Sequence, residues 1–399
     1  MNTINPLEDW LSVMGFMPAD MDRVAKSSGA VERWRNIKCA GDLLRLILVY
    51  VAQDLSLRSA AGWSTATGTA EMADTSVLHR LRCSVPFLEI VLAHLLQQRM
   101  HSEIEAGPPL RLNDASTLSA PGSSGVDWRI HAVYDPASGR LVRVEVTDAH
   151  GGETLSRQRW EPGEVVIADR GLARADGIRA VHDAGAYSLL RMHWQNIRLQ
   201  DERGRPLSLE KVLERAEAGI TGTKVLVPVK KGPATPARLI VVRNSDAAAE
   251  KQRAALIRNA AKKRRTPSPL AMKLTDWFWV LTTIPEKAAS DTLVTELYRI
   301  RWQIELFFKR LKSILNLDVL RAYDPDLAKA YILGKLILAA LVFLLTSECE
   351  AFSPWGIPRR RTPASALVAE HANDLSNLGF DNFRRGGCRP ELGGGPQGG

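Results

Sequence analysis

Three acidic residues, Asp114, Asp169 and Glu305, have sequence neighbours that suit them to bind a divalent metal ion. Asp114 follows the stretch LRLN and Asp169 follows VVIA, so each is expected at the end of a strand buried in a sheet. Carboxylate oxygens are the ligands that hard cations such as Mg²⁺ prefer. Two such ions, about 4 Å apart, can activate a water or hydroxyl and stabilise a leaving oxygen.

The third acid, Glu305, lies in the segment YRIRWQIELFFKRLKSIL, which covers residues 298–315 and is expected to form one helix. At about 100° per residue, four of its polar side chains fall within an arc of about 60°. This polar stripe borders the apolar arc and therefore lies at the edge of a core. The alternative is a surface pair of Arg301 with Glu305, which would contribute only tenths of a kcal/mol. The stripe consists of Tyr298, Arg301, Glu305 and Lys312.

The composition favours a nucleic-acid partner and gives no indication of a membrane partner. The chain has 399 residues and a formal charge of +9, and a balance this basic favours a polyanion. Its four cysteines form no CxxC or Cys/His cluster, which argues against structural zinc and fits a reducing cytoplasm. The most apolar stretch, residues 331–346, contains Lys335 and is shorter than the roughly 20 residues of a membrane span. We expect it to be a buried helix.

The pattern of apolar residues divides the chain into five segments and predicts an α/β fold with a mixed sheet. Within the first segment, residues 56–82 are typical of a helix-turn-helix that carries Arg80 and Arg82, although an ordinary helical bundle is an equal alternative. The segments are 1–105, a helical N-terminal domain with possible DNA binding; 106–192, the first part of the core; 193–275, a β-rich insertion with a basic helix; 276–350, the second part of the core; and 351–399, a basic, Gly-rich tail.

The residues Tyr298, Arg301, Glu305 and Lys312 have the spacing of a known motif. Their pattern resembles the YREK signature of bacterial insertion-sequence DDE transposases, of the IS-four type that opens donor DNA through a hairpin. LNDAST and IADRG resemble the two aspartate motifs of that family, and the likeness covers roughly residues 35–345. The resemblance implies an RNase H-like mixed sheet with a β-rich insertion before the catalytic helix, preceded by an α-helical N-terminal domain.

The resemblance also implies a role for each motif residue. Asp114, Asp169 and Glu305 would be the catalytic ligands of two Mg²⁺ ions, for which Mn²⁺ would substitute. The other three members of the signature would bind the phosphates of the transposon end, because Arg offers a fork, Lys a point charge and Tyr a hydroxyl donor. These phosphate-binding residues would be Tyr298, Arg301 and Lys312.

Further DNA contacts are expected from an aromatic cluster and a basic run. The family places an aromatic residue upstream of the signature, where it stacks on a flipped base. The candidates are Trp277, Phe278 and Trp279, with the alternative that all three are core residues. Lys262, Lys263 and Arg264 belong to a run without acids and are interpreted as DNA-backbone contacts, although such runs are common on solvated helices.

The function implied by the resemblance is a Mg²⁺-dependent DNA transposase. Its partners would be double-stranded DNA at terminal inverted repeats and target DNA, which it would bind as a homodimer in the bacterial cytoplasm, associated with the nucleoid. Two alternatives remain open at this point. One is a nuclease on the same fold that cuts without joining, and the other is a DNA-binding derivative that has lost catalysis.

Overall fold

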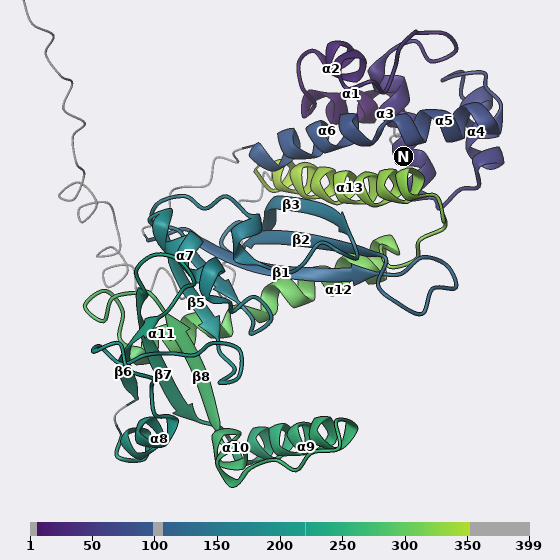
Figure 1. Cartoon of the computed structure of the whole chain (residues 1–399). Helices are drawn as coiled ribbons and strands as arrows, with labels where there is room; N and C mark the ends of the chain where they lie inside the picture. Colours follow the sequence, from purple (N-terminus) through teal and green to yellow (C-terminus); the bar gives the residue numbers. More distant parts are fainter. Residues whose placement is uncertain (1–5, 99–106, 220, 352–399) are drawn as a thin grey trace, which may run out of the picture. The chain divides into compact units, whose positions relative to one another are not determined.

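The computed structural model describes residues 6–98, 107–219 and 221–351 (Figure 1). These residues form two compact units. Almost all of the tail expected over 351–399 lies outside the described residues. The described part of the first unit comprises 6–98, 111–158 and 299–351, and that of the second comprises 107–110, 159–219 and 221–298.

The helical character expected for the N-terminal part is confirmed for its described residues. Six helices form there, and apolar faces of α3 and α6 are buried. The long helix α13 (Pro325–Ala351) packs against α3, α5 and α6. A Cβ on Gly334 of α13 would lie 2.9 Å from Cγ1 of Val51, so this close approach to α3 requires glycine. The six helices are α1 (Pro6–Gly15), α2 (Met21–Ser27), α3 (Ala40–Ala52), α4 (Leu57–Ala66), α5 (Asp74–Cys83) and α6 (Val85–Gln97).

Helix α13 contains the one stretch of the described residues, Pro325–Thr346, that is long and apolar enough to cross a membrane. Its most apolar window is 67% buried inside the protein. Lys335 in the same stretch is only 2% exposed. The expected buried helix is therefore present, and it forms part of the core of the first unit.

The sheet of the first unit is an antiparallel meander of three strands: β1 (Leu110–Leu118), β2 (Trp128–Asp135) and β3 (Arg140–Asp148). A 3₁₀ turn, η1 (Leu155–Arg157), follows. The expectation that a strand ends at Asp114 is wrong. The ladder with β2 continues from Asp114 to Leu118, which pairs with Trp128, so Asp114 lies in the middle of β1.

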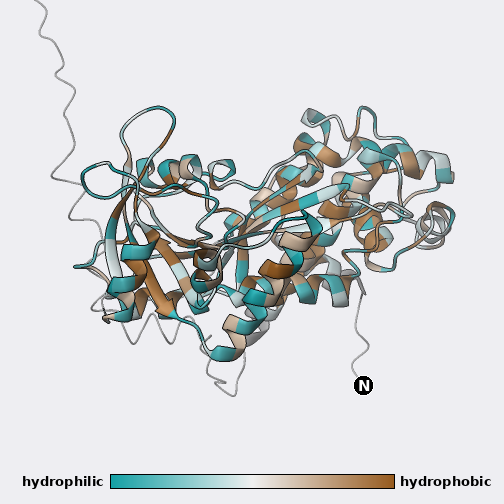
Figure 2. Cartoon of the chain, turned by 60° about the horizontal axis from the view of Figure 1, so that its bottom comes forward, coloured by the Kyte–Doolittle hydropathy of each residue, from teal (hydrophilic) through white to brown (hydrophobic). Residues whose placement is uncertain are grey.

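The sheet of the second unit is mixed, as expected. Its strands follow the order β4-β5-β8-β7-β6, with β4 and β5 parallel and the other neighbours antiparallel. Helix α7 (Ala175–Asp183) connects the parallel pair. All four residues of β4 are buried, and the strands of this sheet are predominantly hydrophobic (Figure 2). The strands are β4 (Val165–Ala168), β5 (Tyr187–Arg191), β6 (Gly222–Val227), β7 (Thr235–Arg243) and β8 (Trp277–Thr282).

The segment 193–275 contains more helical than strand residues where it is described, so the expectation of a β-rich insertion is wrong. Two strands, β6 and β7, join β8, and three helices accompany them. The basic stretch forms a helix, as expected, because Ala, Lys and Arg are strong helix formers. Helices α9 and α10 project from one end of β8 (Figure 1). The helices are α8 (Leu209–Glu217), α9 (Asp246–Lys262) and α10 (Pro269–Leu274).

The expectation of one continuous helix over 298–315 is also wrong. The segment is divided between α11 (Asp291–Arg299) and α12 (Trp302–Leu315), with a turn at Ile300 and Arg301. The N–H of residue 303 bonds the carbonyl of Ile300 at 3.0 Å, and the N–H of residue 304 bonds that of Arg301 at 3.3 Å. These bonds span three residues instead of four. No Pro or Gly marks the turn between the two helices, and the apolar pattern of the sequence continues through it.

Candidate active site

Asp114 lies on the face of β1 that carries contacts to α12. It pairs with Ala132, while Leu112 on the same face of β1 pairs with Tyr134. The ring of Tyr134 lies 5.2 Å from the ring of Phe307 in α12. The Asp114 carboxylate is half-buried and accepts a hydrogen bond from the N–H of residue 115 at 2.9 Å.

Helix α12 contacts this sheet a second time, at a residue of β1 beyond Asp114. Lys312 Nζ donates to the carbonyl of Thr117 at 3.3 Å. The two contacts therefore lie on either side of Asp114 along the sheet, one beside Leu112 and one at Thr117. Glu305, in the first turn of the same helix, is 55% exposed. The first unit thus places Asp114 and Glu305 on elements that pack together.

Glu305 is paired with the Arg that precedes it by one helical turn. Arg301 Nη2 lies 2.6 Å from Glu305 Oε1, and the Arg301 side chain is only 15% exposed. The structure therefore contains the Arg301–Glu305 ion pair, which is the structural alternative to a metal-binding role for Glu305. A guanidinium fork also matches the geometry of a phosphate.

In the second unit, Asp169 directly follows the buried strand β4 and is bonded to Tyr298. The two residues are 129 positions apart, and the Tyr298 hydroxyl donates to Asp169 Oδ1 at 3.2 Å. Tyr298 is in α11 and is 7% exposed. Two motif residues that are remote in the sequence are therefore neighbours in the fold.

The aromatic candidates of β8 fall on its two faces. Trp277 and Trp279 are 7% and 2% exposed, and Trp279 Nε1 donates to the carbonyl of Leu274 at 3.0 Å. Phe278 points the other way and is half-buried. Its ring lies 5.4 Å from that of Tyr298. Phe278 is therefore the candidate that lies beside a residue of the signature.

A basic residue that sequence reasoning missed lies at the same place. The Arg191 guanidinium lies over the Phe278 ring, 5.7 Å from its centre. Burial, and next to it the charges of Arg170 and Arg191, lowers the pKa of His193, so both guanidinium groups lie near that ring. The available signal was the position of Arg191 at the end of the apolar strand β5.

The start of α11 is held by a buried arginine of β7. Arg238 is 5% exposed, and its Nη1 lies 2.9 Å from Asp291 Oδ1 in the first turn of α11. Its Nη2 donates to the carbonyl of Ala289 at 2.7 Å. The hydroxyl of Thr221 donates to Asp291 Oδ2 at 2.6 Å. The insertion thus anchors the helix that carries Tyr298 at its other end.

The basic run of the second unit is exposed. Lys262 ends α9, Lys263 is its C-cap and Arg264 follows, and among its 17 residues the helix buries only Ala249. The ion pair of Arg253 with Asp276, at 2.7 Å, ties α9 to the residue before β8. The three basic side chains therefore lie on a helix end that is open to a polyanion.

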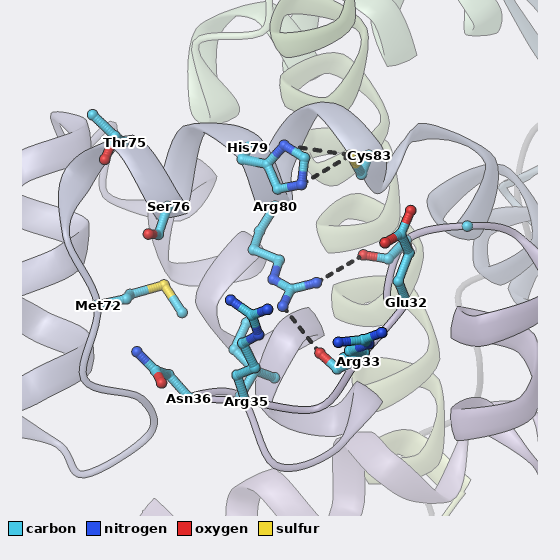
Figure 3. Close-up of a pocket in the computed structure, with 13 residues that line it drawn as sticks. Glu32, Arg33, Arg35, Asn36, Met72, Thr75, Ser76, His79, Arg80 and Cys83 are labelled. Atoms are coloured by element: carbon cyan, nitrogen blue, oxygen red, sulfur yellow. Dashed lines mark hydrogen bonds between the residues drawn. The ribbon is translucent and has the colours of Figure 1, made fainter.

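The N-terminal helices and the loop between α2 and α3 line an open cavity of about 630 Å³, whose charged groups are three arginines, His79 and Glu32 (Figure 3). Arg80 of α5 donates to the carbonyls of Ala30 and Arg33, at 3.5 and 3.2 Å, and so fixes the loop that forms one wall. Arg82 does not line it; it forms an ion pair with Asp324. The polar lining includes Arg33, Arg35, Asn36, Thr75, His79 and Arg80.

The structure does not bring the three acids together within one unit. Asp114 and Glu305 belong to the first unit and Asp169 to the second. Among the described residues, no three Asp, Glu, His or Cys side chains are grouped closely enough to hold a metal ion. The three side chains nevertheless offer only oxygen donors, the set that suits Mg²⁺ or Mn²⁺.

The chain is similar to known transposases over most of its length. Residues 105–341 match the model of the transposase DDE domain. The chain is 34% identical over 356 residues to the putative transposase InsL for insertion sequence element IS186A of Escherichia coli (strain K12), covering 87% of this chain and 96% of that protein. It is also 34% identical, over 357 residues with the same coverage, to the Escherichia coli transposase for insertion sequence element IS421.

More distant relatives extend the likeness. The transposase for insertion sequence element IS231F of Bacillus thuringiensis subsp. israelensis is 24% identical over 375 residues, which covers 83% of this chain and 77% of that protein. A solved piggyBac transposase synaptic complex with hairpin DNA matches 98% of this chain and 84% of its own. The TM-score of this match is 0.45 and the sequence identity is 11%.

Proposed function

Because the chain belongs to the transposase DDE domain family, we propose that it cuts the ends of an insertion sequence through a hairpin intermediate and joins them to target DNA. One observation carries the proposal. The hydrogen bond from Tyr298 to Asp169 joins the first residue of the signature to the second aspartate motif. A chance match of two motifs would not make them neighbours in the fold.

The proposed fold is RNase H-like. Support comes from the element order, in which three antiparallel strands are followed by the β4-α7-β5 unit with its parallel strands. In the proposed active site, Asp114, Asp169 and Glu305 would hold two Mg²⁺ ions, for which Mn²⁺ would substitute. Bound ions would supply activation of the attacking water or hydroxyl and stabilisation of the leaving oxygen.

The chain's own residues orient the carboxylates and bind phosphate. The Tyr298 hydroxyl restricts the rotation of the Asp169 carboxylate. Arg301 holds Glu305 through one nitrogen, and its guanidinium fork has the geometry that binds a phosphate. Lys312 adds a point charge next to β1. Phe278, in preference to the buried Trp277, stacks on a base that leaves the helix.

The proposed partner is double-stranded DNA, at the terminal inverted repeats and at the target, bound by a homodimer at the bacterial nucleoid. The exposed side chains of Lys262, Lys263 and Arg264 contact its backbone. In the N-terminal helices, the arginine-lined cavity takes a further DNA phosphate. Because these contacts displace counterions, affinity falls steeply as salt rises.

The proposed reaction is a series of in-line displacements at phosphorus in one active site. Water attacks the phosphodiester at the element's end and releases a 3′-hydroxyl. That hydroxyl attacks the opposite strand, which frees the flanking DNA and closes the element's end as a hairpin. Water then opens the hairpin and regenerates the 3′-hydroxyl, which attacks a target phosphodiester and releases a target 3′-hydroxyl.

The test is a cleavage assay on the DNA that flanks this gene, with Mg²⁺ and the full chain. We expect nicked, hairpin and blunt-ended products in that order, and joined products when precleaved ends meet a target plasmid. Glu305→Gln should give none of them, whereas the exposed-residue control Asp176→Asn should give all. Cleavage without joined product would favour the nuclease alternative. Binding without any cleavage would favour the derivative that has lost catalysis.

A further inference from the structure

A carboxylate outside the candidate active site joins four parts of the first unit. Asp54 follows α3 and has a left-handed backbone with φ of 50°, a conformation uncommon for a residue with a side chain. Its Oδ1 accepts hydrogen bonds from the Tyr331 hydroxyl and from Lys335 Nζ, the latter at 2.6 Å. Its Oδ2 accepts one from Asn316 Nδ2 at 3.2 Å. Its carbonyl accepts one from Arg321 Nη1 at 2.6 Å.

The first consequence concerns α13. Lys335 is the one charged residue between positions 330 and 346, and it is almost fully buried. A buried ammonium needs a counter-charge and hydrogen-bond acceptors, which Asp54 supplies. Tyr331, one turn earlier, is also buried and packs edge-on against Tyr50 of α3 at 6.1 Å. Asp54 therefore fixes the register of α13 against α3.

The second consequence concerns α12. Asn316 is the C-cap of α12, with a left-handed backbone and an N–H that bonds the carbonyl of Leu311. Arg321 belongs to the connection that leads from α12 to α13. Asp54 grips both, so it holds the C-terminal end of α12 against the N-terminal helices. An α-helix transmits such a constraint along its length because every turn is hydrogen-bonded.

We propose that Asp54 is a positioning residue, which sets the place of Glu305 beside β1 by anchoring the far end of α12. The inference rests on the proposed role of Glu305 in DNA cleavage. Lys312 and Phe307 contact the sheet along the same helix, so a shift or rotation of α12 moves these contacts and the Glu305 carboxylate together. The Asp54 cluster thus connects the N-terminal helices to the candidate active site within the first unit.

The discriminating variant is Asn316→Gly. Glycine keeps the left-handed C-cap at no steric cost, so the end of α12 can still form, and only the side-chain bond to Asp54 is lost. Asn316→Asp is the stronger variant, because it places a carboxylate against Asp54. Asp54→Asn leaves buried Lys335 without a counter-charge and risks unfolding, so it is not the primary variant. Glu89→Gln is the matched control, since it removes the Lys329–Glu89 ion pair of 2.7 Å that ties α13 to α6.

For Asn316→Gly we expect unchanged melting temperature and DNA affinity, and a cleavage rate at saturating DNA and Mg²⁺ lower by about ten-fold or more. Asn316→Asp should lower the rate further, and Glu89→Gln should leave it unchanged. Amide hydrogen exchange in peptides of residues 302–315 should quicken in Asn316→Gly and not in the control, whether or not DNA is present.

The outcomes separate the two proposals. If Glu305→Gln abolishes cleavage while Asn316→Gly cleaves like the wild type, the positioning role is wrong and the proposed function stands. If Glu305→Gln itself cleaves normally, the proposed function is wrong. In that case unchanged hydrogen exchange in Asn316→Gly would also overturn the anchoring of α12. Faster exchange of α12 would keep the anchor and remove only its link to cleavage.

Discussion

The two units differ in which end of a helix they hold. The second unit holds the start of α11, whereas the first unit holds the end of α12. In the second unit, Arg238 holds the start of α11 and Tyr298 at its end is buried against Asp169. In the first unit, Asp54 holds the end of α12 and Glu305 at its start is 55% exposed. The second unit therefore presents an acid that is bonded to a buried tyrosine, whereas the first presents an exposed acid that is paired with Arg301.

The largest expected effect tests whether Asp169 and Glu305 are both needed for DNA cleavage. We expect Asp169→Asn and Glu305→Gln each to lower DNA cleavage by at least about 100-fold. Glu305→Gln should leave the melting temperature unchanged because the side chain is exposed. Single-turnover cleavage and thermal unfolding measure the two quantities. Retention of cleavage by either variant would show that the corresponding unit supplies no catalytic carboxylate.

The next effect breaks the anchor of the second unit. Arg238→Met leaves Asp291 with Thr221 as its remaining side-chain partner and should lower the free energy of unfolding by about 3 kcal/mol. Arg253→Met, which removes a more exposed ion pair from α9, is the matched control and should cost less than about 1 kcal/mol. Chemical denaturation measures both. Equal effects would mean that the buried anchor is no stronger than a surface pair.

A third prediction concerns the pH dependence of folding stability, through a buried histidine of the first unit. Burial, and next to it Arg157 and Arg129, lowers the pKa of His131 to about 4, and His131 is 3% exposed. The unfolded chain takes up this proton near pH 6.5 and the folded chain only near 4, so acid favours unfolding. Between pH 7 and pH 4.5 the folded state should lose about 2 kcal/mol through this residue.

The measurement is denaturant unfolding across that pH range, for the wild type and for His131→Gln. The variant should show a shallower dependence, because glutamine cannot take up the proton and can still bond Thr147, the partner of His131 at 3.1 Å. The second unit has His193, whose pKa burial also lowers, so His193→Gln serves as the comparison. A parallel pH dependence in wild type and His131→Gln would contradict the prediction.

The smallest expected effect concerns the hydrogen bond between Tyr298 and Asp169. Tyr298→Phe keeps the ring contact with Phe278 and removes the hydroxyl bond to Asp169. The loss should cost about 1 kcal/mol of stability. Cleavage should fall less than in Asp169→Asn, because the carboxylate is still present. A rate as low as that of Asp169→Asn would show that the hydroxyl does more than orient it.

The sequence predicts the helical N-terminal part, the β2–β3 hairpin, the buried strands and the basic helix, because each has a local period or turn signal. It places Asp114 at the end of a buried strand, whereas Asp114 lies in the middle of β1, since polar residues in a strand resemble its end until the partner strand is known. It misses the break between α11 and α12, because Ile300 continues the apolar pattern and no Pro or Gly marks the turn.

The residues that hold the candidate site in place could not be predicted from the sequence, for a different reason. Arg238 meets Asp291, and Asp54 meets Asn316 and Lys335, across separations at which no spacing rule applies. Asp114, Asp169 and Glu305 stand out by type and spacing, and their roles as metal ligands stay a prediction. Short-range patterns identify residues suited to chemistry, whereas the long-range ion pairs that hold them appear only in the fold.

The ion pair of Lys335 with Asp54 has a consequence during synthesis of the chain. Pro325–Thr346 is apolar enough to enter a bilayer when it leaves the ribosome, before its partners have packed on it. Lys335 lies at its middle, where a lysine opposes membrane insertion by about 3 kcal/mol. Asp54 neutralises the charge of Lys335 in the folded chain. Before the helix has packed, the same charge disfavours its insertion into a membrane.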